Sequence, residues 1–224
     1  MYKYETHLHT SPVSKCASGT VRECLEFYKK LNYDGVFITN HFLDGNINVD
    51  RQLPYEEKIN FYFSDYEEGV KIGEELGIKV FPGVEISYKG TDFLIYGLSK
   101  EWYLAHPEIM EMKKSDELNY LAENGALVIQ AHPYREASYI DHIRLFPRSV
   151  HGVELNASRP KDENEFVKLY AKQYGLLVFA GSDNHMRSAD RDLGGMETEK
   201  CINSVEEFIE AVLSKEANPF LTED

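Results

Sequence analysis

Five short apolar segments of the chain each lead into a histidine or a carboxylate side chain. The segments end in the motifs His7-Leu-His9, Thr39-Asn-His41, Pro82-Gly-Val-Glu85, Gln130-Ala-His132 and Gly181-Ser-Asp183-Asn-His185. In a β/α barrel the C-terminal strand ends converge on one mouth, where side chains that are distant in sequence meet. An open sheet would spread five such ends too widely for them to act together. We therefore predict a closed barrel with one site at its mouth.

Seven apolar runs have the length and composition of buried strands. The expected strands cover residues 2–6, 35–39, 78–81, 93–96, 126–129, 152–155 and 176–180. Helices are expected over residues 107–124 and 162–174. Three further helix starts are indicated by a capping residue with a glutamate three positions later, namely Thr20 with Glu23, Ser64 with Glu67, and Ser204 with Glu207. Strands that alternate with helices favour a parallel β/α arrangement.

The length of the chain is that of one domain. It has 224 residues, of which 42% are hydrophobic, and this is enough for one substantial core. Because no repeat, low-complexity tract or linker divides the sequence, we expect a single domain over residues 1–224. The least regular stretches, 42–63 and 186–198, are rich in polar residues and glycine and directly follow motif histidines. These two stretches are expected to be active-site loops.

Charge and cysteine content narrow the range of partners and compartments. The net charge of 24 − 38 = −14 works against general binding to nucleic acid or to anionic membranes. The three cysteines (Cys16, Cys24 and Cys201) are odd in number and widely spaced, so they form neither a disulfide framework nor a Cys-x-x-Cys metal site. The N-terminus lacks the apolar core of a signal peptide, and no apolar stretch approaches the ~20 residues that span a bilayer. A reducing cytoplasm is the expected compartment.

The spacing of the motif residues is typical of metal ligands. His7 and His9 are two residues apart at a strand end, so both imidazoles lie on the same side of the chain. Asp183 and His185 repeat this spacing. Imidazole combined with carboxylate suits zinc, iron(II) and manganese(II), whereas magnesium and calcium prefer oxygen alone. One such motif is more often a coincidence than a metal site, but five motifs at five strand ends make a metal site the better interpretation. Glu85, a single carboxylate among histidines, is suited to bridge two ions.

Together the motifs resemble the PHP family, which is named for domains shared by bacterial replicative polymerases and histidinol phosphatases. They follow the family's order over nearly the whole chain. The resemblance implies a distorted seven-stranded, TIM-like β/α barrel with two or three divalent metal ions (zinc, manganese or iron) and hydrolysis of phosphomonoesters or phosphodiesters. By motif match it implies one ion held by His7, His9, Glu85 and Asp183, a second held by Glu85 and His132, and a third held by His41 and His185.

Three positions depart from the family's pattern. Members often carry aspartate or histidine a few residues after the first motif, where this chain has Lys15 and Cys16. Either Cys16 replaces that ligand as a thiolate, or Lys15 abolishes the contact. Many members have a histidine in the strand after the glutamate motif, where this chain offers Asp92, so the second ion would be bound more weakly or through oxygen. Asn40 stands where the family usually has aspartate, which alters the hydrogen bonding to His41.

The resemblance also implies a mechanism. The expected reaction is attack by a hydroxide that the metal ions generate from water near neutral pH, while the ions clamp the phosphoryl oxygens. Asp183, His185 and Arg135 are the expected catalytic residues. Arg135, three residues after the fourth motif's histidine, either grips a phosphate through its planar fork of donors or is a surface arginine, and the sequence favours neither. Arg187 and Arg191 could assist, although a surface position is favoured for both.

Other polar residues have less specific settings. Glu154 and Asn156 lie at alternate positions at a strand end, where they either orient ligands or substrate or make structural hydrogen bonds. His106, His142 and His151 do not follow predicted strands. We expect these three histidines at the surface or behind the ligands.

Two other functions are open at this point. An amidohydrolase-type barrel also begins with two histidines on its first strand, but it normally ends with a lone catalytic aspartate, so the pair of Asp183 and His185 disfavours it. A non-catalytic PHP module, which keeps its metal for stability while it binds or regulates another chain, is disfavoured by the near-complete ligand set. The expected partner is a small phosphorylated substrate such as histidinol phosphate or a nucleotide. The sequence does not determine the oligomeric state.

Overall fold

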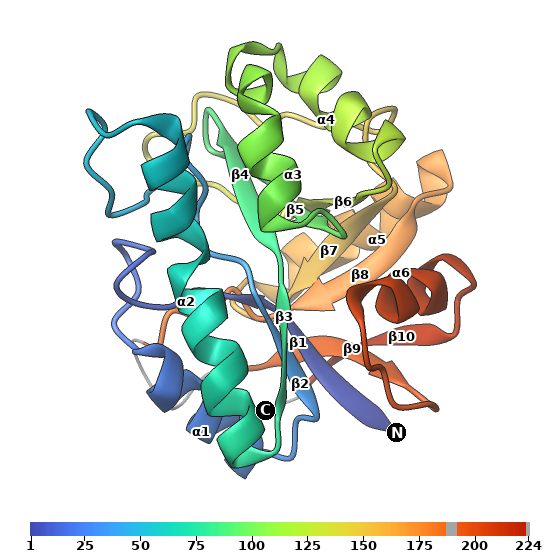
Figure 1. The fold of residues 1–224 in the computed structure, drawn as a ribbon. Coiled ribbons are helices and arrows are strands. Elements are labelled where there is room, and N and C mark those ends of the chain that lie inside the picture. Colours follow the sequence, from blue (N-terminus) through green and yellow to red (C-terminus); the bar gives the residue numbers. More distant parts are fainter. Residues whose placement is uncertain (187–191, 223–224) are drawn as a thin grey trace.

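The computed structural model describes residues 1–186 and 192–222, so Arg187 and Arg191 lie outside the described residues. Its strands form two five-stranded sheets (Figure 1). The first sheet has the order β10 (Ala217–Leu221), β9 (Gly194–Thr198), β1 (Tyr2–Leu8), β2 (Gly35–Ile38) and β3 (Lys79–Pro82). The second sheet has the order β4 (Val84–Tyr88), β5 (Thr91–Tyr96), β6 (Leu127–Ala131), β7 (Gly152–Asn156) and β8 (Leu177–Gly181).

The two sheets do not merge into one closed barrel. Over the described ranges, the strand ladders end at the edges of each sheet. Isolated bridges link the sheets instead, one between Leu8 and Asn184 and the other between His41 and Glu85. The predicted closed barrel is therefore not confirmed, and the fold is a mixed α/β fold with two sheets.

The predicted parallel arrangement holds for part of each sheet. The trios β1–β2–β3 and β6–β7–β8 pair in parallel. β5 pairs antiparallel with both β4 and β6, and β9 pairs antiparallel with both β1 and β10. The connection from β4 to β5 consists of Lys89 and Gly90, whose φ angles of 52° and 82° are those of a tight hairpin turn. A parallel pair needs a crossover of a dozen or more residues, so this connection dictates antiparallel pairing.

Two of the three predicted helix starts are confirmed. α1 (Val21–Lys30) begins at Thr20, whose hydroxyl and backbone exchange hydrogen bonds with Glu23, and α6 (Val205–Leu213) begins at Ser204. The start predicted at Ser64 is wrong, because α2 (Tyr55–Leu76) begins after Pro54 and Ser64 lies inside it. The last part of the predicted 42–63 loop is therefore helical, and likewise β9 occupies the end of the predicted 186–198 loop.

The remaining helices connect strands of the second sheet. They are α3 (Lys100–Ala105), the 3-10 helix η1 (Pro107–Glu111), α4 (Lys114–Glu123) and α5 (Lys161–Tyr174). The helix expected over 107–124 is thus divided into η1 and α4, while α5 matches its prediction. None of the described helices combines the length and the apolar character needed to cross a membrane.

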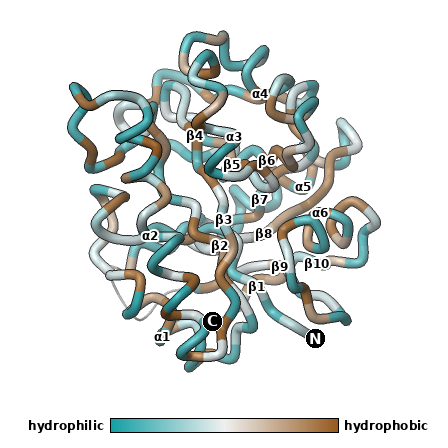
Figure 2. The backbone as a smooth tube through the Cα atoms, viewed as in Figure 1, coloured by the Kyte–Doolittle hydropathy of each residue, from teal (hydrophilic) through white to brown (hydrophobic). Residues whose placement is uncertain are grey.

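Helices cover the outer faces of the sheets, and aromatic side chains fill the space within. α2 packs on α1 and β3, α4 on β6, and α5 on β7 and β8 (Figure 1). Figure 2 shows central strands such as β8 as largely hydrophobic, with hydrophilic stretches along the outer helices and loops. The inner core combines both sheets with α6 through Tyr4, Phe37, Phe81, Tyr96, Phe179 and Phe208. This rigid core sets the positions of the strand ends from which the site is built.

Candidate metal centre

The seven predicted metal ligands meet where strands of the two sheets end. They lie at the end of β1 (His7, His9), after β2 (His41), on β4 (Glu85), after β6 (His132) and after β8 (Asp183, His185). Their donor atoms form three groups, within each of which all atoms lie within 4.8 Å of one another. The groups are His7, His9 and Asp183; His7, Glu85 and His132; and His9, His41 and His185.

The first group is compact and largely shielded from solvent. The Nε2 atoms of His7 and His9 are 3.1 Å apart. Asp183 Oδ1 lies 3.5 Å from the Nε2 atom of His7 and 3.3 Å from that of His9. Both histidines are fully buried, and Asp183 is 13% exposed. The equal spacing in two of the sequence motifs therefore does bring two imidazoles and one carboxylate to a common point.

Glu85 lies between the second and third groups. Its Oε1 atom is 3.2 Å from His7 Nε2 and 3.6 Å from His132 Nε2. Its Oε2 atom is 3.4 Å from His9 Nε2 and 2.5 Å from His41 Nδ1. The two carboxylate oxygens thus face different sets of imidazoles, which is the arrangement that a bridging ligand requires.

The donor atoms of this centre suit divalent cations. Glu85 Oε2 and His41 Nδ1 are both shielded from solvent and pair with each other at 2.5 Å. Imidazole nitrogens together with carboxylate oxygens are the ligand set of zinc, iron(II) and manganese(II). The three groups therefore fit the divalent ions that the resemblance implies.

Two of the ligands have unusual backbone conformations. His132 has a φ angle of 26° and Asp183 one of 49°, both in the left-handed region that residues other than glycine seldom adopt. Such conformations cost about 1–3 kcal/mol each and cluster at functional sites. In this chain they turn the two side chains towards the centre immediately after β6 and β8.

A buried carboxylate on β7 supports two ligands from behind. Glu154 Oε1 lies 2.8 Å from His7 Nδ1, and its Oε2 accepts hydrogen bonds from the backbone N–H of His132 at 3.1 Å and from Asn156 Nδ2 at 2.9 Å. This contact directs His7 Nε2 towards the metal groups. A carboxylate behind a ligating histidine fixes its tautomer and raises its affinity for metal. Glu154 therefore contacts two of the predicted ligands, His7 through its ring and His132 through its backbone.

A second set of polar residues holds His9 and the segment before His41. His9 Nδ1 lies 3.0 Å from Ser14 Oγ, which donates to Asn40 Oδ1 at 2.7 Å. Asn40 Nδ2 in turn donates to Asp65 Oδ2 at 3.1 Å. Asn40 therefore acts through Ser14 on His9 and on the backbone N–H of His41, which donates to Ser14 Oγ at 3.1 Å.

Burial and neighbouring charges shift the pKa values of these side chains in both directions. Burial raises the pKa of a carboxyl, but the neighbouring histidines outweigh it and hold the pKa values of Glu85 and Asp183 well below their usual range. Burial and the adjacent imidazoles lower the pKa of His9. Burial also acts to lower the pKa of His7, but the facing carboxylates, Glu154 first, raise it. Ionised carboxylates and a neutral His9 are ready to bind a cation.

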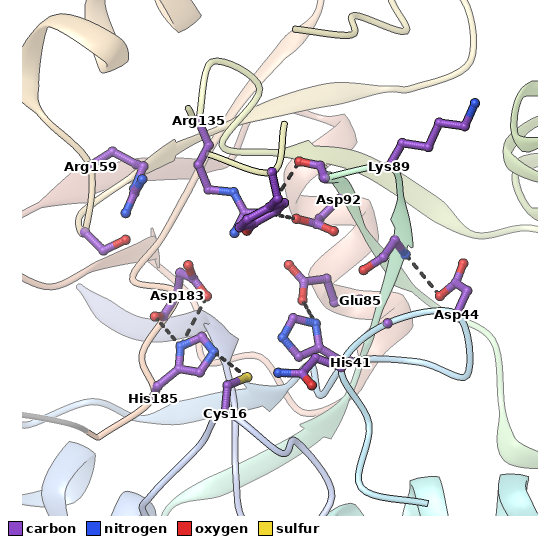
Figure 3. A pocket seen from close by; sticks show the side chains of 16 residues that line it. Cys16, His41, Asp44, Glu85, Lys89, Asp92, Arg135, Arg159, Asp183 and His185 are labelled. Carbon is purple, nitrogen blue, oxygen red and sulfur yellow. Dashed lines mark hydrogen bonds and ion pairs between the residues drawn. The ribbon is translucent and has the colours of Figure 1, made fainter. Parts of the chain in front are cut away.

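The centre opens into a cavity of about 690 Å³. Four of the predicted ligands line it (His41, Glu85, Asp183 and His185), and His7, His9 and His132 lie behind them. Figure 3 shows Arg135 and Arg159 on the opposite side of the cavity from His41 and His185. Histidine side chains therefore line one side of the cavity, and positively charged arginine side chains line the other.

Arg135 lies at the cavity but is held by a carboxylate. Its Nη2 donates to Asp92 Oδ2 at 2.8 Å, and Asp92 Oδ2 is also 4.0 Å from His132 Nε2. Asp92 thus lies beside the second group. It stands in the strand in which many PHP proteins have a histidine. Arg135 Nε is buried and has no hydrogen-bond partner within the described residues.

Sequence reasoning missed Glu5 and Arg159. Glu5 is fully buried and accepts hydrogen bonds from the backbone N–H groups of His7 and Ser182 and from Tyr28 Oη. Its spacing of two from His7 placed it on the same face of β1, and this signal could have identified it. Arg159 lies in the loop after β7, and no local pattern distinguishes it from a surface arginine.

The three histidines outside the motifs are not part of any metal group in the described ranges. His106 stacks on Trp102, with ring centroids 4.4 Å apart. His142 pairs with Asp141 at the surface. His151 accepts a hydrogen bond from the backbone N–H of a strand residue at its Nδ1.

Comparison with known proteins gives structural rather than sequence matches. No family model and no curated protein matches the sequence. A two-domain protein from Bacteroides vulgatus that contains a predicted PHP-like metal-dependent phosphoesterase is 14% identical and superposes with a TM-score of 0.67. The match covers 98% of this chain but 64% of that protein. The fold is similar to that of PHP-like proteins.

Two further solved structures match over nearly their whole length. One, from Bifidobacterium adolescentis, is provisionally described as a metal-dependent phosphoesterase. It is 15% identical and superposes with a TM-score of 0.56, and the match covers 95% of this chain and 96% of that one. The other is an amidohydrolase from Chromobacterium violaceum with bound sulfate and no metal; it is 14% identical, with a TM-score of 0.55 and coverage of 93% and 96%. At these identities the matches establish the fold alone, and a hydrolase is the activity class that the neighbours' names share.

Proposed function

We propose that this chain is a metal-dependent phosphoesterase that hydrolyses a small phosphomonoester or phosphodiester. The observation that carries the proposal is the convergence of seven imidazole and carboxylate ligands in three groups beside an arginine-lined cavity. The names of two structural neighbours, both described as metal-dependent phosphoesterases, support this choice of reaction.

Two or three ions would be distributed over the three groups. His7, His9 and Asp183 would hold one ion, and Glu85 would join His132 on a second; His41 and His185 would hold a third. When bound, such ions activate water and neutralise charge on phosphoryl oxygens. Zinc, manganese or iron fits the nitrogen and oxygen donors.

The protein's own part in the reaction is orientation and charge. Asp183 and His185 line the cavity, so they are the ligands next to the reacting phosphoryl group. Arg135 supplies a guanidinium group, of which Nη2 is already fixed by Asp92 and Nε is buried, and Nη1 is left to bind a phosphoryl oxygen. Glu154 keeps His7 in one tautomer.

A small phosphorylated molecule is the proposed substrate. A cavity of about 690 Å³ lies within the range of small-molecule sites. The net charge of −14 opposes general attraction of nucleic acid polymers. Histidinol phosphate and nucleotides are the first two substrate types to assay.

An amidohydrolase activity is the second candidate, because one structural neighbour is an amidohydrolase. The two candidates differ in the charge of the group that reacts. An amide or ester carbonyl does not need the cations at the cavity wall, whereas a phosphate does. Arg135 therefore favours the phosphoesterase.

The test combines metal analysis with hydrolysis of chromogenic substrates. Purified protein is reconstituted with manganese, zinc or iron(II), its metal content is measured, and the wild type is compared with Asp183→Ala, His9→Ala and the surface control His142→Ala on a phosphomonoester, a phosphodiester and an amide. We expect two or three ions per chain and ester hydrolysis that is lost in the first two variants and kept in the control. Amide hydrolysis alone would support the amidohydrolase, and metal-loaded protein inert on all three substrates would favour a binding or regulatory module.

A further inference from the structure

A cysteine borders the third group of ligands. Cys16 lies in the loop between β1 and α1, lines the cavity, and places its Sγ atom 3.1 Å from His185 Nε2. The thiol also forms a hydrogen bond with the His41 ring. Figure 3 shows Cys16, His41 and His185 side by side at one wall of the cavity. Three side chains with soft or borderline donors therefore lie together at this wall.

The backbone fixes this cysteine next to His185. The backbone N–H and the hydroxyl of Ser18 both donate to the carbonyl oxygen of His185, each at 3.1 Å. The backbone N–H of Ala17 donates to the carbonyl oxygen of Ser14 at 3.1 Å, and Ser14 in turn contacts His9. The loop is thus bonded to two segments that carry ligands, and Cys16 lies between these bonds. Its neighbour Lys15 is exposed.

The third group is short of donors without this thiol. His9 Nε2 lies as close to the first group as to the third, at 3.1 Å from His7 Nε2 and 3.3 Å from Asp183 Oδ1. If His9 serves the first ion, the third keeps the imidazoles of His41 and His185 and the Oε2 atom of Glu85, which is one donor fewer than a tetrahedral zinc site needs. His41 Nδ1 faces Oε2 of the 1% exposed Glu85 at 2.5 Å, so these two donors already lie together. The thiol of Cys16 is placed to complete the set.

The observed spacing is close to that of a coordinated pair. With Zn–N distances of 2.0–2.1 Å and a Zn–S distance of 2.3 Å, a tetrahedral site separates nitrogen from sulfur by about 3.6 Å. Cys16 Sγ and His185 Nε2 are 3.1 Å apart, so they would have to separate by about half an ångström to share an ion. Loop side chains make such shifts readily.

We propose that Cys16 binds the ion of the third group through its sulfur, together with His41 and His185. The inference rests on the proposed function and specifies the chemistry of its centre. The thiol releases its proton to the solvent as the metal–sulfur bond forms. Thiolate is a soft ligand that selects zinc over manganese, which prefers carboxylate, carbonyl and water. The third ion is therefore zinc or another thiophilic metal, whatever fills the other two groups.

The other two cysteines provide internal controls. Cys24 is buried in the apolar face of α1, and burial raises the pKa of its thiol to about 12. Cys201 lies beside Lys79, whose Nζ is 3.1 Å from its sulfur, and neither residue lines the cavity of the metal centre. Cys201→Ser is thus a matched control for Cys16→Ser: both remove a partly buried thiol that contacts a nitrogen.

Cobalt(II) is the probe for the test. A thiolate bound to cobalt gives a charge-transfer absorption band in the near ultraviolet, which imidazole and carboxylate ligands do not give. Metal-free protein is titrated with cobalt, and we expect the band in the wild type and in Cys201→Ser but not in Cys16→Ser. Cys16→Asp should bind metal without the band, so that loss of the band is separated from loss of folding.

Metal selectivity supplies a second measurement. Loss of a direct ligand should lower zinc affinity by at least about tenfold, the lower bound for loss of an outer-shell partner. Cys16→Asp should also reduce the ratio of zinc to manganese affinity. A wild type that binds two or three cobalt ions without the charge-transfer band would overturn the inference and leave Cys16 as a hydrogen-bond partner of His185. The band is read without any turnover, so its presence in an inactive protein would reject the phosphoesterase and keep the thiolate ligand.

Discussion

Replacement of Glu154 by glutamine tests whether the centre depends on the carboxylate behind His7. The substitution keeps the size of the side chain but replaces one of two acceptor oxygens with an NH2 donor. If the amide oxygen faces His7 Nδ1, the NH2 group faces the backbone N–H of His132 and the amide of Asn156, which are also donors. If the NH2 group faces His7, the ring must carry its proton on Nε2, the atom that faces the metal groups.

Both orientations weaken the centre, by an amount that follows from the contacts. Glu154 is fully buried, and a hydrogen bond to a charged group contributes about 1.5–3 kcal/mol. Loss of a carboxylate that orients a ligating histidine typically lowers metal affinity 10–100-fold, or about 1.4–2.7 kcal/mol. We expect a decrease of this size in zinc affinity for Glu154→Gln.

Competitive titration against a chromogenic chelator measures the affinity, and Glu5→Gln is the matched control. Glu5 is equally buried and lies equally close to His7, but it accepts from the backbone N–H of that residue and contacts no imidazole ring. Glu5→Gln should therefore lower the free energy of unfolding while metal affinity stays close to that of the wild type. Equal metal affinity in the wild type and Glu154→Gln, or equal losses in both variants, would refute the assigned role of Glu154.

Three further variants address stability. Thr20→Ala removes the side-chain cap of α1 and should lower the free energy of unfolding, measured by chemical denaturation, by about 1 kcal/mol. An unchanged denaturation midpoint would count against the capping box. Gly181→Ala places a Cβ atom 2.5 Å from Glu154 Oε1 and 2.7 Å from His7 Cβ. It should therefore lower the free energy of unfolding by about 1–3 kcal/mol and weaken metal binding. Wild-type stability together with wild-type metal affinity would contradict this prediction. Burial raises the pKa of Glu117 from 4.5 to about 7, so the folded state holds this proton more tightly than the unfolded state does. The resulting stabilisation is complete below about pH 4.5 and is lost as the pH rises through about 7. The free energy of unfolding of the wild type should therefore fall by up to about 3 kcal/mol relative to that of Glu117→Gln between pH 4.5 and 8. Parallel curves of unfolding free energy against pH would contradict the raised pKa.

The ligand set was predictable because its signals are local. An apolar run followed by a histidine or a carboxylate can be recognised from the sequence of one strand end alone. The spacing of two between His7 and His9 places both on the same side of the strand, and this follows without any tertiary contact. All seven ligands predicted in this way lie in the three groups. The left-handed backbone at His132 and Asp183 was not predictable, because such conformations are imposed by surrounding structure rather than by residue type.

The parts that sequence reasoning missed depend on long-range pairing. The pairing of Arg135 with Asp92 follows from the register of β5 on β6, which places Asp92 opposite the residue before His132. The contact between Cys16 and His185 joins positions 169 residues apart through an irregular loop. The division into two sheets follows from short connections such as the turn at Gly90, whose length is visible in the sequence only once both flanking strands are recognised.

The division of the strands also determines what holds the two halves of the molecule together at the centre. Three of the ligands lie on or follow strands of the first sheet (His7, His9 and His41), and four lie on or follow strands of the second sheet (Glu85, His132, Asp183 and His185). Each of the three groups contains donors from both sides, so an ion in any of them acts as a cross-link between the sheets. Such a cross-link stabilises the joined arrangement, and the stabilisation grows with the logarithm of the metal concentration above the Kd. Backbone amides at the two isolated bridges, those of Glu85 and Asn184, should therefore exchange with solvent faster in chelated protein than in metal-loaded protein, while amides in the middle of β1 and β7 should not.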